Sequence, residues 1–125
     1  MRILACLLLS LVAGTAFAAC GPQTKTPAAE RIANTVNWTT ASEQDNFGYD
    51  VYRGNDEKGP FVKLTKQAIL GHGTTDETHE YHFRDDSIEL CKAYWYYVES
   101  VSTDGKREKF TPVFRAKPKT AASKP

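Results

Sequence analysis

The sequence predicts an all-β fold, a seven-stranded antiparallel β-sandwich, and three observations lead to it. Residues 30–116 are rich in β-branched and aromatic side chains, apolar and polar residues alternate there in short runs, and turn residues such as Asp104 and Gly105 separate the runs. Alternation with a period of two is typical of strands that bury one face, and many short strands at close spacing are typical of a sandwich. With 125 residues, the chain is long enough for one such domain.

The first 19 residues have the composition of an export signal. Arg2 is followed by an apolar run from Ile3 to Val12 and then by small residues up to Ala19. A basic start, a short apolar stretch and small residues before the cleavage site are typical of a secretory signal peptide. The apolar run is too short to span a membrane, which takes about 20 residues. We therefore expect residues 1–19 to be removed on export.

The residues before Cys20 extend this interpretation. The stretch from Phe17 to Cys20 resembles a bacterial lipobox, in which small residues precede a cysteine that is lipidated and becomes the new N-terminus. The resemblance implies that Cys20 is the lipidation site and that Gly21 directs the protein to the outer membrane. Several acyl chains on one cysteine anchor a protein stably. The alternative is cleavage after Ala18 or Ala19, which would leave a soluble periplasmic or secreted protein.

Two segments outside the domain contain no large apolar residue. We expect residues 20–29 to form a flexible tether from the lipidated Cys20, and residues 117–125 to form a disordered tail. Of the three cysteines, Cys6 lies in the signal and Cys20 is assigned to the lipid. Cys91 is then left unpaired, and because no activating neighbour is evident we expect it to be structural and inert.

The charge balance excludes one class of partner. The chain has 16 basic and 15 acidic side chains. Five of the basic residues lie outside residues 30–116, namely Arg2, Lys25, Lys117, Lys119 and Lys124. The domain therefore carries a net negative charge. Because proteins that bind nucleic acid present a basic face, we expect no nucleic-acid partner.

The strand signals follow one another along the domain. We expect strands at residues 35–39, 48–53, 61–64, 80–84, 94–101 and 110–116, preceded by a weak first strand at 31–33. The segment 71–78 is polar, and we expect it to be a mobile loop.

From Asn37 to Val113 the sequence resembles a bacterial fibronectin type III-like domain, which has an immunoglobulin-like β-sandwich fold. The stretches that carry the resemblance are Trp38 to Arg53, Gly59 to Leu64, Tyr81 to Asp85 and Lys92 to Val101. The resemblance implies that Tyr94 forms the tyrosine corner of this fold, with its hydroxyl bonded to nearby backbone. It implies little about function, because one fold can carry many unrelated roles.

The same alternation predicts the core and one candidate binding face. The side chains expected to point inward are Trp38, Tyr49, Val51, Tyr94, Tyr96 and Val98, with Ile88 beneath the corner. Those expected to point outward on two neighbouring strands are Tyr52, Trp95 and Tyr97. Clustered exposed aromatic residues often mark an interaction surface. The alternative is ordinary cross-strand pairing that covers the sheet.

The sequence offers no strong sign of a metal site or of catalysis. His72, His79 and His82 lie near several acidic residues, but on a strand His79 and His82 would face opposite sides. We therefore expect no metal and no cofactor. No serine lies in a nucleophile elbow, and Gly71-His72-Gly73 is too short for a phosphate loop. We expect no catalytic residues, and so no enzyme.

These expectations combine into a function class without a named partner. The chain is predicted to be a non-catalytic lipoprotein of the bacterial cell envelope, whose domain binds an envelope protein or polysaccharide or serves a structural role. Protein–protein interaction is the first interpretation. The alternative is a carbohydrate-binding accessory module that uses the face formed by Tyr52, Trp95 and Tyr97.

Overall fold

The computed structural model describes residues 20–121, so the predicted signal peptide and the last four residues of the predicted tail lie outside the described part. Residues 20–121 contain one short 3-10 helix, η1 (Ala28–Glu30), and eight strands: β1 (Asn34–Thr40), β2 (Glu43–Gly54), β3 (Phe61–Lys63), β4 (Ile69–Thr75), β5 (His79–Asp85), β6 (Tyr94–Ser102), β7 (Arg107–Lys109) and β8 (Phe114–Ala116). In this range there is no helix with the length and hydropathy needed to cross a membrane.

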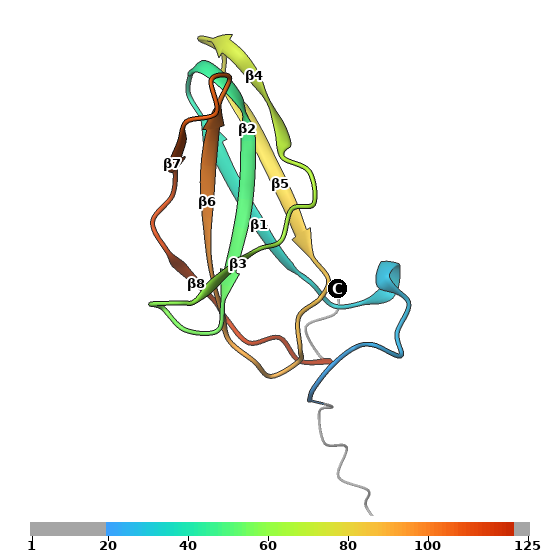
Figure 1. Cartoon of the computed structure of the whole chain (residues 1–125). Helices are drawn as coiled ribbons and strands as arrows, with labels where there is room; N and C mark the ends of the chain where they lie inside the picture. Colours follow the sequence, from blue (N-terminus) through green and yellow to red (C-terminus); the bar gives the residue numbers. More distant parts are fainter. Residues whose placement is uncertain (1–19, 122–125) are drawn as a thin grey trace, which may run out of the picture.

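The strands form two antiparallel sheets that lie face to face (Figure 1). The smaller sheet contains β1 and β5, which pair from Asn34 opposite Asp85 to Thr40 opposite His79. The larger sheet has the order β3-β2-β6-β7, with β4 also paired to β2 and β8 also paired to β6. The predicted all-β class with antiparallel sheets is confirmed.

Three strand predictions need correction. The segment predicted to be a mobile loop, 71–78, contains most of β4. Its alternation was hidden because Gly71 and Gly73 have no side chain, although Gly71 faces the buried side chains of Asn46 and Glu43. Of the predicted strand at 110–116, only Phe114–Ala116 forms a strand, β8, while β7 ends before it at Lys109. Pro112, in the gap between the two strands, has no N–H to donate to a ladder. Residues 31–33 form no strand, and the side-chain amide of Gln23 bonds both backbone groups of Ile32 instead.

Aromatic packing joins the two sheets. All six residues predicted for the core lie in the interior, at 6 % exposure or less. The Trp38 ring from β1 stacks on Tyr81 from β5 and meets the edge of Tyr49 from β2, both with ring centroids 5.5 Å apart. Because buried aromatic pairs contribute both apolar area and specific ring contacts, this cluster stabilises the contact between the layers.

The connection between β5 and β6 is held by a buried tyrosine. The Tyr94 hydroxyl accepts a hydrogen bond from the backbone N–H of Glu89 at 2.8 Å. Ile88 is 2 % exposed and belongs to the core cluster together with Tyr94. This is the contact that a tyrosine corner makes.

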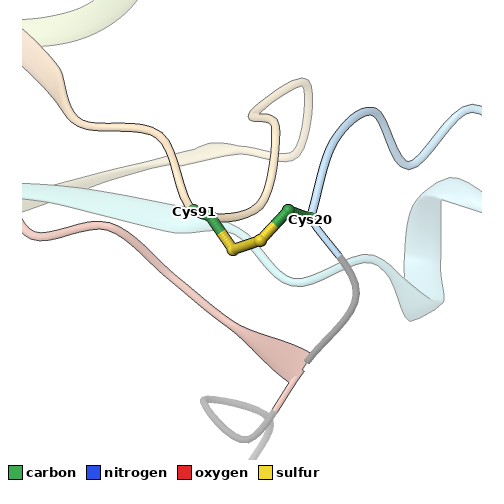
Figure 2. Close-up of a disulfide and its surroundings, with 2 residues drawn as sticks. All are labelled: Cys20 and Cys91. Carbon is green, nitrogen blue, oxygen red and sulfur yellow. A yellow bond between two sulfur atoms is a disulfide. The ribbon is translucent and has the colours of Figure 1, made fainter. Parts of the chain in front are cut away.

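A disulfide joins Cys20 to Cys91 in the β5–β6 connection (Figure 2). The prediction that Cys91 is an unpaired thiol is therefore wrong. That Cys20 carries a lipid stays a prediction, and it holds only for a chain without this disulfide, because a sulfur bonded to another sulfur cannot form the thioether. Lipid and disulfide are alternative states of the same atom. The spacing of 71 residues between the cysteines gave no local signal of their pairing.

The segment predicted to be a flexible tether is bonded to the domain. Beyond the disulfide, Gly21 and Leu90 exchange two backbone hydrogen bonds, of 3.2 and 2.9 Å. The Gln23 amide also donates to the carbonyl of Ile88 at 3.1 Å. The start of the predicted disordered tail is held in a similar way, because the N–H of Cys91 donates to the carbonyl of Lys119 at 2.7 Å.

Candidate functional site

The three residues of the predicted binding face lie on the outer side of the larger sheet, and two of them are in direct contact. Tyr52 on β2 is paired with Tyr97 on β6. Their rings stack with centroids 4.8 Å apart and planes 4° from parallel. All three side chains, Trp95 included, are only partly exposed. We call the surface made by Tyr52, Trp95 and Tyr97 the aromatic face.

Neighbouring side chains enclose Tyr97. Phe61 on β3 packs against its ring nearly at a right angle, with centroids 5.0 Å apart. The ammonium group of Lys109 on β7 lies 4.5 Å from the centroid of the same ring, a cation–π distance. Phe61 reaches this position because its partner Gly54 has no side chain, and a Cβ there would lie 3.0 Å from the Phe61 ring.

Trp95 lies on the same side of β6 but is not part of this stack. Its strand partners are Gly54 on β2 and Arg115 on β8. The Arg115 guanidinium carbon lies 5.7 Å from the centroid of the Trp95 ring. Among the described residues, no ring contact links Trp95 to the two tyrosines.

A charged network borders the aromatic face. The Tyr52 hydroxyl donates to Glu99 at 3.0 Å, and Arg107 donates to both Glu99 and Asp50, at 2.7 and 2.9 Å. Burial, followed by the bond to Glu99, raises the pKa of Tyr52. Burial alone would raise the pKa of Asp50, but hydrogen bonds from Thr65 and Arg107 hold it below its ordinary value. The network fixes the tyrosine hydroxyl and places both charge signs beside the rings.

This geometry limits what the aromatic face can bind. The faces of the Tyr97 ring are occupied by Tyr52 and by Lys109. The pair therefore presents ring edges and hydroxyl groups, rather than an open row of flat rings. Protein partners accept such an irregular mixture of aromatic and charged groups. A flat sugar ring therefore has no free face of Tyr97 on which to stack.

The three histidines are placed differently from one another. His79 and His82 face opposite sides of β5, as predicted, and the His82 Nδ1 atom lies 2.5 Å from the side-chain oxygen of Asn37. His72, however, comes from β4 and stacks on His79, with ring centroids 3.5 Å apart. The sequence did not predict this pair because β4 had been interpreted as a loop.

Glu43 beside these histidines is a residue that the sequence reasoning missed. A β-bulge in β2, where Asp45 has a positive φ of 47°, turns both Glu43 and Asn46 inward. Burial alone would raise the pKa of Glu43, but hydrogen bonds from Tyr81, the backbone of His72, Thr40 and Asn46 together hold it below its ordinary value. In a regular strand, inward-facing residues are two positions apart, whereas the bulge lets Glu43 and Asn46, three positions apart, both face inward. A search for regular alternation therefore could not find this carboxylate.

A shallow hollow lies near the same end of the larger sheet. Its volume is about 230 Å³, and its wall includes Asn46, Tyr49, Ser100 and Phe110. This volume is below the range of roughly 300–1,000 Å³ that is usual for small-molecule sites. The hollow therefore gives weaker support for a binding site than the aromatic face does.

Comparisons with known proteins give one limited match. No protein-family model matches the chain, and no solved structure gives a significant match. The chain is 29 % identical over 87 residues to the amylopullulanase of Thermoanaerobacter thermohydrosulfuricus. The match covers 69 % of this chain but only 5 % of the amylopullulanase, so the similarity is confined to a small region of that much longer protein.

Proposed function

We propose that this chain is an exported, non-catalytic module of the fibronectin type III type that binds a protein of the bacterial cell envelope through its aromatic face. The strand order and the bond between Tyr94 and Glu89 support the fold assignment. The observation that carries the binding proposal is the Tyr52–Tyr97 stack with Phe61 and Lys109 packed against it. Tyrosine, tryptophan and arginine are the residues that dominate protein–protein binding energy.

Two independent features support export. Residues 1–19 have the pattern of a secretory signal, and the Cys20–Cys91 disulfide is of a kind that persists in oxidising compartments. We propose that the exported domain carries this disulfide. A lipid anchor at Cys20, the other proposal for this residue, requires the form in which the disulfide is not made.

Replacing Trp95 is the sharpest test of the binding face. Trp95→Ser removes a large aromatic side chain that lies outside the tyrosine stack, so the domain should stay folded. Chemical cross-linking in the envelope, followed by mass spectrometry, identifies the protein partner of the wild-type chain. Affinity for that purified partner should then fall about 30-fold in the variant, the equivalent of roughly 2 kcal/mol for one hot-spot residue.

The matched control is Leu70→Ser. Leu70 is 67 % exposed on β4 and lies outside the aromatic face, so its replacement should leave the affinity unchanged. Equal binding by folded Trp95→Ser and wild-type protein would show that the partner binds elsewhere.

The match to amylopullulanase favours one second candidate, a carbohydrate-binding accessory module. The name of that protein denotes an enzyme acting on pullulan, and the region shared with this chain is a small part of it. Native electrophoresis in gels containing pullulan distinguishes the two candidates. Retardation of the wild-type protein that is lost in Trp95→Ser would support the carbohydrate module and contradict a protein partner for the aromatic face.

A further inference from the structure

Three side chains with metal-binding atoms meet at the end of the sandwich drawn at the top of Figure 1. Glu43 is the first residue of β2, His72 lies in β4 and His79 is the first residue of β5. One ligand atom from each lies within 4.8 Å of the others. Because β5 belongs to the smaller sheet and the other two strands to the larger one, this cluster bridges the two layers.

The buried carboxylate in the cluster has no strong positive partner. The Glu43 side chain is 1 % exposed. Its oxygens accept hydrogen bonds from uncharged groups, with Thr40 at 3.0 Å, Asn46 at 2.5 Å and Tyr81 at 2.6 Å. Within residues 20–121, no lysine or arginine forms an ion pair with it, and the basic group that approaches it is Nδ1 of His72 at 3.7 Å. A buried charge is costly unless an opposite charge compensates it.

The hydrogen bonds orient His72 for a ligand. The Tyr81 hydroxyl has one proton and donates it to Glu43, so its oxygen accepts from Nδ1 of His72 at 2.7 Å. Nδ1 of His72 is therefore protonated, and the lone pair of the neutral ring lies on Nε2. A histidine that donates its other ring N–H toward a carboxylate is the usual arrangement behind a metal ion. The His72 side chain is 47 % exposed, so an ion can reach it.

His79 supplies a second imidazole at contact distance. Its ring lies parallel to that of His72 within 6°, at a centroid separation of 3.5 Å. Neutral imidazole nitrogens are ligands that suit zinc, copper and nickel.

We propose that His72 and His79 bind a divalent transition-metal ion of the zinc class, with Glu43 behind them as the compensating charge. Tyr81 links the carboxylate to His72 and so positions that ligand. Parallel rings cannot both direct an in-plane lone pair at one ion, so the partly exposed His79 ring tilts when the ion binds. The bound ion connects β4 to β5 and thereby ties the two sheets together at this end.

Thermal unfolding of the untagged protein, followed by circular dichroism, tests this proposal with zinc chloride as the probe. Zinc far above its dissociation constant should raise the melting temperature by about 5 °C or more, and EDTA should reverse the rise. Magnesium chloride should have no effect, because magnesium prefers oxygen ligands. His72→Ala and His79→Ala should each abolish the shift. Glutamine at either position serves as a second variant if the alanine protein folds poorly.

His82→Ala is the matched control, because His82 lies on β5 with His79 but faces away from the cluster. It should retain the full zinc shift. Tyr81→Phe keeps the buried ring but removes the link to Glu43, and should weaken zinc binding about tenfold by titration calorimetry. The proposal is overturned if zinc does not shift the wild-type protein, or if the shift survives in the His72 and His79 variants. Loss of the shift in His82→Ala would also overturn it.

Discussion

The two ends of the sandwich each contain a buried carboxylate, but only one carries a permanent counter-charge. At the end of β5, Asp85 receives two hydrogen bonds from the Arg53 guanidinium, of 3.1 and 2.9 Å. At the opposite end, Glu43 faces His72 instead. We refer to these as the Asp85 end and the Glu43 end. Arginine stays charged at any ordinary pH, whereas a histidine can lose its charge near neutral pH.

The hydrogen bonding at the two ends is otherwise closely parallel. In each case a buried tyrosine donates its hydroxyl proton to the carboxylate, Tyr96 to Asp85 and Tyr81 to Glu43, both at 2.6 Å. In each case the tyrosine oxygen accepts from a nitrogen, which is the Asn34 amide at the Asp85 end. Burial and the neighbouring carboxylate raise the pKa of both tyrosines well above the ordinary value. The two ends therefore differ chiefly in the source of positive charge.

Covalent and backbone contacts follow the same division. The disulfide and the Tyr94–Glu89 bond both lie in the connection that follows Asp85. The Glu43 end has the bulged start of β2 and the stacked histidines instead. The Asp85 end therefore has the covalent link and the arginine ion pair, and the Glu43 end has the residues of the proposed metal site.

The largest expected effect comes from removing the charge of Asp85. Asp85→Asn keeps the size of the side chain but leaves Arg53 without a counter-charge, and Arg53 is only 18 % exposed. The free energy of unfolding should fall by about 3–5 kcal/mol. Glu43→Gln should cost about 1 kcal/mol, because no arginine or lysine loses a partner there. Urea denaturation of both variants measures the difference, and equal losses would contradict the comparison.

Acid titration gives a second measurement on the same pair. Burial would raise the pKa of Asp85, but bonds from Tyr96, Ser87 and Arg53 hold it below the ordinary value of 3.8. A carboxylate whose pKa is lowered on folding contributes stability above its unfolded pKa, and this contribution is lost as the pH falls through the folded pKa. The wild-type protein should therefore lose stability below about pH 4, and Asp85→Asn should show a smaller loss over that range.

How far the sequence predicts these regions depends on the regularity of the strands. Strict alternation in β1 and β6 placed Trp38, Tyr94 and Tyr96 in the core, and the structure has them there. The Glu43 end could not be predicted because a bulge and two glycines interrupt the alternation in β2 and β4. The aromatic face was predicted as three outward residues, but the order of contacts within it depends on Phe61 and Lys109 from other strands.

The second-largest expected effect on stability comes from removing the disulfide at the Asp85 end. Cys91→Ser should lower the free energy of unfolding by about 2–4 kcal/mol, because it removes a covalent link between residues 71 positions apart. It should also leave Cys20 reactive toward a thiol reagent in the unfolded protein. Denaturation curves and thiol titration of the wild-type and variant proteins measure both outcomes.

Cys91→Ser also distinguishes a Cys20 that forms the disulfide from a Cys20 that carries a lipid. If Cys20 carries a lipid, its sulfur is not available to Cys91, so Cys91→Ser should be silent and the protein should still take up labelled palmitate. If the disulfide forms, the wild-type protein should not be labelled. Palmitate labelling together with an unchanged stability in Cys91→Ser would show that the Asp85 end is not covalently tied.

The smallest expected effect is that of the single hydroxyl at the tyrosine corner. Tyr94→Phe keeps the ring, which is 2 % exposed and lies 4.7 Å beneath the Arg53 guanidinium. It removes the acceptor for the N–H of Glu89, and a partly buried N–H that loses its partner costs about 1 kcal/mol. The loss should be of that size in urea denaturation, well below that of Asp85→Asn. Arg53 contacts both the Tyr94 ring and Asp85. The loss of unfolding free energy in the double variant, Asp85→Asn with Tyr94→Phe, should therefore differ from the sum of the losses in the two single variants. Strict additivity would mean that the corner and the ion pair stabilise this end independently.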